Sequence, residues 1–177
     1  LVCAGLFGGR SYAYLRDLFR AVGRAFYGGT GDEELYDRMT AAAAAVPPGS
    51  DGVTCQPFFT GLRSQPDLRA SFAGLSPETL TPGHLTRALL EGMADAFAGY
   101  YQRIAPYSGA RSRLIGAGNG IRLNPLLAEI LADRFTRPLL LPLAEEPGAV
   151  GAALLLGVRL GLLPNLEAIG QTLAYQR

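Results

Sequence analysis

Residues 114–125 combine a short apolar run, three alternating glycines and the start of a helix: Leu114, Ile115, Gly116, Gly118, Gly120, Asn124 and Pro125. The apolar run is typical of a buried strand, and the glycines allow positive φ angles and a close approach of a ligand to the backbone. Asparagine followed by proline is a usual N-cap and first residue of a helix. Such a turn presents backbone N–H groups near the positive end of a helix, which predicts a site for a phosphate or the flat face of a nucleotide.

Two common nucleotide motifs do not match this segment. A dinucleotide-binding fold would place an acidic residue after a second strand about 20 residues further on, where the chain has Arg137 and Pro138. A Walker loop would need Gly-Lys-Ser or Gly-Lys-Thr after the glycines. Glycine turns between strands and helices also occur without a ligand, so a plain connector stays an alternative for this segment considered by itself.

Composition narrows the class of protein. The 177 residues are enough for one domain with a substantial core, and the 16 basic and 15 acidic residues give a formal net charge of +1. This balance argues against nucleic acid or a membrane surface as a partner. Cys3 and Cys55 lie too far apart to indicate a disulfide framework, so we expect a cytoplasmic protein. One histidine and two cysteines leave little for a metal site, and we expect none.

The order of apolar patterns predicts a single α/β domain. The expected strands are 1–6, 53–59 as a strand or extended loop, 114–115 and 137–142. The expected helices are 11–26, 33–45, 82–104, a helix from 125, 147–161 and 166–175. A second glycine turn is expected at 7–11, a break at 106–109, and a polar loop of possible functional use at 60–75. The chain begins without methionine inside an expected strand, so we interpret it as a fragment.

Several other polar residues could do chemistry, but each has a simpler structural interpretation. We expect His84 to be a solvated or capping residue rather than a catalytic one, and Glu91 to be a satisfied helix carboxylate. The pair Glu145–Glu146 is better placed as acids at a helix start than as a paired acid and base. Arg63 and Arg69 are either surface residues or contacts for a phosphate or an opposing domain, and both interpretations stay open.

Three blocks resemble, in the right order, the C-terminal half of the FGGY carbohydrate kinases. They cover residues 4–13, residues 57–93 and residues 116–153. Within that family the chain is most similar to sedoheptulokinase, through the motif Gly-x-Gly-Asn-Gly-x-Arg-x-Asn that ends at Asn124 and a Gly-x-Arg loop that ends at Arg63. The resemblance implies an actin-like ATPase domain of the ribonuclease H type, with a mixed sheet flanked by helices. In the full enzyme, two such domains would close over ATP and the sugar.

The resemblance also implies which residues bind the nucleotide: Gly9, Gly116, Gly118, Asn119, Gly120 and Asn124. Residues 118–120 would lie along adenine and ribose, and Asn124 matches an asparagine or serine that contacts the base. Gly9 matches a glycine near the phosphates. Ala13 falls where some relatives carry glutamine, so no side-chain contact is expected from it.

The implied reaction is phosphoryl transfer from ATP, with Mg²⁺, to a sugar hydroxyl, which requires a carboxylate to take the proton. The family's catalytic aspartate and its phosphate-binding Gly-Thr turn belong upstream of residue 4. Asp32, Asp51 and Asp67 match neither motif, so we expect no catalytic residue in this chain and no activity from it alone. The partners are ATP or ADP and a sugar, held mainly by a missing N-terminal domain.

The motifs favour sedoheptulose as the sugar, with another ketose or polyol (xylulose, ribulose or glycerol) as the nearest alternative. A hypothesis from a different class is a non-catalytic actin-like module for binding or assembly. A plain α/β domain that binds no nucleotide is the third.

Overall fold

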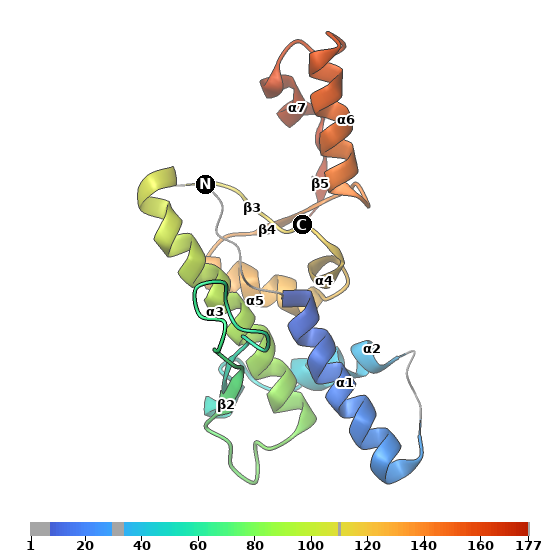
Figure 1. The fold of residues 1–177 in the computed structure, drawn as a ribbon, viewed down its shortest axis with the longest axis vertical. Coiled ribbons are helices and arrows are strands. Elements are labelled where there is room, and N and C mark those ends of the chain that lie inside the picture. The colour runs from blue at the N-terminus through green and yellow to red at the C-terminus, as the bar shows by residue number, and fades with distance from the viewer. Residues whose placement is uncertain (1–7, 30–33, 110, 177) are drawn as a thin grey trace.

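A long helix, α3 (Pro82–Ser108), lies at the centre of the molecule, as Figure 1 shows. The computed structural model describes residues 8–29, 34–109 and 111–176. Helices α1 (Gly8–Tyr27), α2 (Leu35–Ala44) and α5 (Pro125–Phe135) and the strand β1 (Thr54–Gln56) all pack against α3. The predicted strand at 1–6 lies outside the described residues.

The start of α3 follows from its sequence, but its end does not. Thr81 is the N-cap, its side chain accepts a hydrogen bond from the His84 N–H, and Pro82 occupies the first turn. The predicted break at 106–109 is wrong, because the helix runs through Pro106 to Ser108. A proline removes only one helical hydrogen bond, and the Gly109 N–H still closes the last turn on the Ala105 carbonyl.

A small antiparallel sheet covers one side of α3. The strand β1 pairs with β2 (Ser71–Ala73), so that Cys55 lies opposite Phe72. The short η1 helix (Ser50–Gly52) precedes β1. The strand predicted within 53–59 is confirmed, and it ends before Pro57, which has no N–H for a ladder. The prediction that 60–75 has no regular structure is wrong at β2, because Phe72 packs against the core and brings its neighbours into register.

The second sheet has three short strands in the order β3 (Leu114–Ile115), β4 (Leu139–Pro142) and β5 (Tyr175–Gln176). The strands β3 and β4 are parallel, and β5 is antiparallel to β4. A one-turn helix, α4 (Asn119–Arg122), lies between β3 and α5. The last predicted helix is shorter than expected, because α7 (Leu166–Thr172) ends before the chain returns to pair with β4. The mixed sheet with its helices confirms the α/β class.

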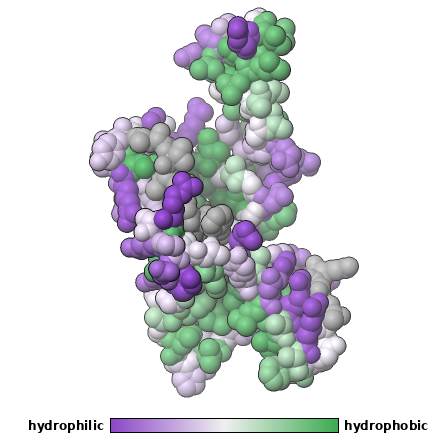
Figure 2. Space-filling view, viewed as in Figure 1, coloured by the Kyte–Doolittle hydropathy of each residue, from purple (hydrophilic) through white to green (hydrophobic). Residues whose placement is uncertain are grey.

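The core lies where α1, α2, α3, α5 and β1 meet. Its most deeply buried side chains are Leu15, Met39, Ala43, Val53, Leu89, Leu90, Met93 and Ala94. By contrast, α6 (Pro147–Arg159) has no buried residue and projects with α7 away from this core (Figure 1). Figure 2 shows that the projecting part is largely apolar, including the exposed Leu155, Leu156 and Leu160. None of the helices in the described part of the chain has the length and hydropathy needed to cross a membrane.

A close approach of backbones fixes α3 against β1, and this contact generates a prediction. A Cβ added to Gly92 would collide with the Cys55 carbonyl oxygen, and the rigid backbone of β1 cannot yield as a flexible side chain would. Gly92→Ala should therefore lower the free energy of unfolding by roughly 2 kcal/mol or more, as overpacking does. Urea unfolding followed by circular dichroism measures this change.

The matched control is Gly99→Ala on the same helix, because a Cβ there meets no atom within 4 Å. This variant should be neutral, or more stable by up to about 1 kcal/mol, because alanine favours helix over glycine. An equal decrease in the free energy of unfolding of the two variants would show that the close approach of α3 to β1 is not the reason why residue 92 must be glycine.

Candidate functional site

The glycine turn after β3 is more ordered than the sequence indicated. The Gly116 N–H donates to the Leu140 carbonyl at 2.9 Å, and a Cβ on Gly116 would meet the side chains of Ile121, Leu139 and Leu141. Gly118 has φ of 99° and leads into α4, a single helical turn within the segment that we predicted as a glycine turn. Gly116 therefore serves close packing, and Gly118 serves the change of chain direction.

The glycine turn touches the beginning of α1. A Cβ on Gly120 would lie 3.4 Å from the Gly9 Cα, at van der Waals contact, so the two backbones are close and a side chain larger than alanine at residue 120 would crowd Gly9 or the space beside it. The sequence suggested a separate glycine turn at 7–11. In the structure, Gly9 lies in the first turn of α1. There, backbone N–H groups have no partner within the helix. Two segments far apart in the sequence thus form one surface.

A cleft of about 450 Å³ opens beside this contact. Its walls come from α1, α2, α3, α4 and α5, and the predicted nucleotide residues Gly9, Asn119, Gly120 and Asn124 are all among its lining residues. Gly118 does not line it, and Gly116 lines a neighbouring apolar pocket of about 500 Å³ that also touches Gly9 and Gly120. The volume is in the range of small-molecule sites.

Asn124 is the most informative residue of the cleft. Its side chain is at the N-cap of α5, where Oδ1 accepts a hydrogen bond from the Leu127 N–H at 2.9 Å, as the sequence predicted. The residue is only 4% exposed, and its Nδ2 makes no hydrogen bond of normal geometry among the described residues, although the Tyr12 hydroxyl lies near enough to interact with it. A buried donor without a partner costs about 1–3 kcal/mol. The amide is therefore a donor available to a ligand in the cleft.

The wall opposite Asn124 comes from residues that the sequence analysis missed. Tyr12 and Tyr36 stack with ring centroids 5.5 Å apart, and the Tyr12 hydroxyl lies 2.9 Å from the Thr40 hydroxyl. Burial raises the pKa of Tyr12, against a smaller opposing effect of the hydrogen bond with Thr40, so the phenol stays neutral. The sequence carried no signal that this face of α1 would meet α2, because the contact depends on how the two helices pack in the folded chain.

The chemistry of the lining suits the neutral part of a nucleotide. Asp37 and Thr40 supply acceptors, Asn124 supplies a donor, and Tyr36 supplies a flat ring. Among the described residues that line the cleft there is no lysine or arginine. The described chain also lacks any group of three or more histidine, cysteine, aspartate or glutamate side chains that could hold a metal ion. Because Tyr12 stacks on the Tyr36 ring and the Arg16 guanidinium lies over that ring at 4.9 Å, the cleft would hold a base and a ribose mainly by hydrogen bonding.

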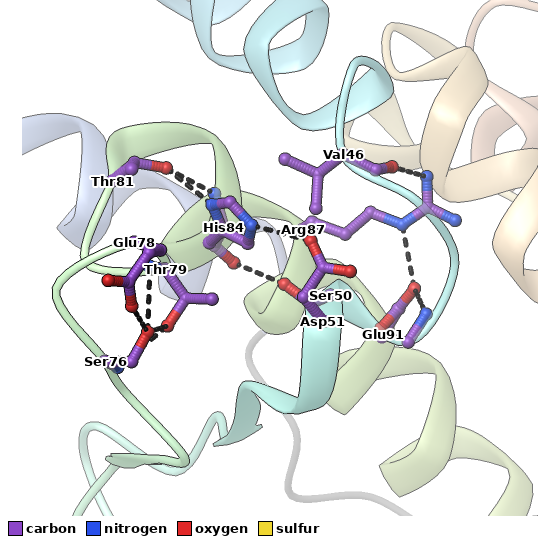
Figure 3. Close-up of polar contacts among 11 residues, drawn as sticks. Val46, Ser50, Asp51, Ser76, Glu78, Thr79, Thr81, His84, Arg87 and Glu91 are labelled. Carbon is purple, nitrogen blue, oxygen red and sulfur yellow. Dashed lines mark hydrogen bonds and ion pairs between the residues drawn. The ribbon is translucent and has the colours of Figure 1, made fainter.

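His84 and Glu91 belong to a structural network around the start of α3, shown in Figure 3. The His84 Nδ1 lies 2.7 Å from the Thr81 hydroxyl, and its Nε2 lies 3.0 Å from the Asp51 carboxylate. Glu91 accepts hydrogen bonds from the Arg87 Nε at 2.8 Å and from the Gly49 N–H at 3.0 Å. The N-cap is Thr81 rather than His84, and His84 supports that cap from the first turn, while the satisfied interpretation of Glu91 is confirmed.

The remaining candidates lie away from the cleft. Arg69 donates to the Pro66 and Leu68 carbonyls of its own loop, and Arg63 is exposed. Glu145 pairs with Arg122 at 3.4 Å on the surface before α6, which confirms its place at a helix start.

The described cysteine is not a reactive one. Burial raises the pKa of the Cys55 thiol to about 12, so it stays protonated and inert at neutral pH. Cys3 lies outside the described residues.

Comparison with known proteins identifies similar chains. The model of the "FGGY family of carbohydrate kinases, C-terminal domain" matches residues 6–160. A glycerol kinase of Leptothrix cholodnii is 34% identical over 174 residues, which are 93% of this chain and 32% of that protein. An autoinducer-2 kinase of Yersinia enterocolitica is 33% identical over 173 residues, 94% of this chain and 32% of that protein. The chain thus spans about a third of the length of these relatives.

Solved structures give the same picture. A xylulose kinase from Rhodospirillum rubrum superposes with a TM-score of 0.72 at 33% identity, over 85% of this chain and 28% of that chain. A glycerol kinase from Plasmodium falciparum, solved with ADP, superposes with a TM-score of 0.73 over 95% of this chain and 31% of that chain; at 20% identity it supports the fold alone. These neighbours confirm the predicted actin-like, ribonuclease H-type fold.

Asn124 caps α5 through its Oδ1 and offers its Nδ2 to a ligand, and the free energy of unfolding can separate these two roles. Asn124→Ala removes the cap of α5 and should lower the free energy of unfolding by about 1 kcal/mol, as cap deletions do. Asn124→Thr keeps a side-chain oxygen at the cap and loses only the unpartnered amide, so its cost should be within about 0.5 kcal/mol. Urea unfolding of both variants measures the difference. Equal losses would mean that the cap is not what Asn124 contributes to folding.

Proposed function

The chain belongs to the FGGY family of carbohydrate kinases, whose C-terminal domain it matches, and on that premise we propose that it is the nucleotide-binding half of an ATP-dependent kinase for a sugar or polyol hydroxyl. The observation that carries this proposal is the cleft in which Gly9, Asn119, Gly120 and Asn124 come together from α1, α4 and the start of α5. All four belong to the sequence blocks that resemble the family.

The residues present fit an adenosine group. The unpartnered Asn124 Nδ2 would donate to a ring nitrogen of the base, which has several acceptors on its edge. The approach of Gly120 to Gly9 leaves a surface that side chains at these positions would fill. Asp37 and Thr40 would accept hydrogen bonds from the ribose hydroxyls or from an exocyclic amine. Gly9 would lie towards the phosphates, in the first turn of α1, because the N-terminal end of a helix favours an anion.

The work of this chain in the reaction would be positioning. ATP with Mg²⁺ supplies the phosphoryl group when bound, and the transfer depends on alignment, charge neutralisation and a carboxylate that takes the hydroxyl proton. The described residues of the cleft contribute neither a cation nor a metal cluster. We therefore assign to this chain the holding and orientation of the adenosine, and to the remainder of a longer protein the proton acceptor and the sugar contacts.

The identity of the acceptor stays a prediction. The relatives reported above are named for glycerol, autoinducer-2 and xylulose, and none of these names supports sedoheptulose. The proposal is accordingly a polyol or ketose acceptor, with glycerol and xylulose before sedoheptulose. A cytoplasmic location likewise remains a prediction.

Calorimetric titration with ADP and Mg²⁺ tests the cleft without requiring activity. We expect saturable binding to the chain, weakened at least tenfold in Gly120→Leu, because a leucine side chain there must displace Gly9 or fill the cleft. Asn124→Thr should also weaken binding by about tenfold, the usual worth of one lost hydrogen bond to a buried partner.

The matched control is Gly148→Leu, a helical glycine of α6 with no atom within 4 Å of an added Cβ. It makes the same chemical change on the projecting part of the molecule and should bind ADP like the parent chain. Absence of ADP binding, or equal weakening in all three variants, would remove the support for the kinase assignment and leave a non-catalytic module or a domain without nucleotide.

A second experiment concerns the reaction. The chain by itself should show no ATP-dependent phosphorylation of glycerol or xylulose, because we found in it no carboxylate that matches the family's proton acceptor. A coupled assay that detects ADP release in the presence of either acceptor measures this, with a glycerol kinase as the positive control. Acceptor-dependent turnover above the rate without acceptor would contradict the prediction and would place a proton acceptor within these 177 residues.

A further inference from the structure

A second polar pocket lies at the end of β3 opposite to the glycine turn. The strands β3 and β4 are parallel, and Leu114 pairs with Leu139, so Arg113 and Arg137 lie at the same amino-terminal edge of the sheet. The glycine turn begins where β3 ends, at Gly116. The two ends of one short strand thus lead to two different surfaces.

The pocket has a volume of about 460 Å³ and contains three arginines. We call it the arginine pocket, and its polar and aromatic lining residues are Arg111, Arg113, Arg137, Ser108, Tyr101 and Tyr107. The Arg137 guanidinium donates a hydrogen bond to the Arg111 carbonyl, which holds the loop after α3 against the start of β4. The Tyr101 ring rests against Phe135 with centroids 5.7 Å apart and forms an aromatic floor.

The positive charge in the arginine pocket is not balanced by acids. Among the described ion pairs, the carboxylates engage other arginines, as Asp95 does with Arg134, and none engages Arg111, Arg113 or Arg137. No aspartate or glutamate is found among the described residues of the lining. The chain as a whole carries a formal net charge of only +1, so this concentration of charge is local.

The end of α3 accounts for only part of this arrangement. Helix α3 ends at Ser108, beside the pocket, and a helix C-terminus carries roughly half a negative charge. That partial charge favours one nearby arginine but leaves the greater part of three full charges without a partner. Arg111 and Arg113 are exposed, so water and salt screen part of the mutual repulsion, and a bound anion would neutralise the remainder.

We propose that the arginine pocket binds a small phosphorylated anion at a site separate from the nucleotide cleft. Guanidinium groups bind phosphate oxygens through paired N–H donors, and several of them around one pocket can surround a phosphate group. The Tyr101 and Phe135 rings supply an apolar surface for the carbon part of such a molecule. This inference does not depend on the proposed kinase function.

Isothermal titration calorimetry of the chain with inorganic pyrophosphate, without Mg²⁺, tests the proposal. The informative variant is Arg111→Gln with Arg113→Gln, because these two side chains make no hydrogen bond or ion pair in the described part of the fold. The matched control is Arg63→Gln with Arg159→Gln, which removes the same charge at two exposed positions outside the pocket. The midpoint of thermal unfolding verifies that each variant is folded.

We expect saturable binding of pyrophosphate to the parent chain, at least a tenfold weakening in the pocket variant, and a change of less than twofold in the control. Binding should persist in Gly120→Leu. Three results would overturn the proposal: no saturable heat in the parent chain, equal weakening in both variants, or at least a tenfold weakening of pyrophosphate binding in Gly120→Leu, which would locate the anion in the nucleotide cleft.

Discussion

The structure depends on how closely the backbone of α3 approaches its neighbours. Gly92 lies against the Cys55 carbonyl of β1, and a Cβ on Gly83 would be 2.7 Å from the Ala42 carbonyl of α2. Two glycines on one helix therefore let a strand and a second helix pack on it at backbone distance. Because α2 is held in this way, its face meets α1, and Met93, one residue beyond Gly92, reaches the floor of the cleft.

That packing decides which side chains line the candidate nucleotide cleft. Its walls come from α1, α2, α3, α4 and α5, and they carry hydroxyls, one carboxylate, two amides and two tyrosine rings. Such a lining discriminates mainly by hydrogen bonding rather than by charge. The charged groups of the same region lie at the other end of β3, in the arginine pocket. One two-residue strand thus separates a neutral surface from a basic one.

Membership of the C-terminal domain of the FGGY family agrees with a chain whose family-matched residues gather at one cleft. The relatives are about three times as long as the matched region, and in kinases of this kind catalysis is mainly a matter of position and charge. Hence the activity of a longer protein cannot be attributed to this cleft alone.

The sequence by itself determined the local elements, because caps, glycines and apolar periodicity act over a few residues. Asn124 with Pro125 predicted the start of α5, and Thr81 with Pro82 marked the start of α3, each of which the structure confirms by a side-chain cap. The family motif selected residues of the glycine turn, but it could not separate those that face the cleft from Gly116, which is packed inside. That distinction depends on Ile121 and Leu139, which reach Gly116 only in the folded chain.

Only the tertiary structure decided which distant segments meet. The stacking of Tyr12 on Tyr36, the contact of Gly120 with Gly9, and the pairing of Cys55 with Phe72 each join segments whose sequences carry no mark of one another. The sequence likewise predicted a break at 106–109, where packing and the closing hydrogen bond of Gly109 carry α3 past a proline. Local propensity is a small free energy per residue, and the burial gained when elements pack together outweighs it.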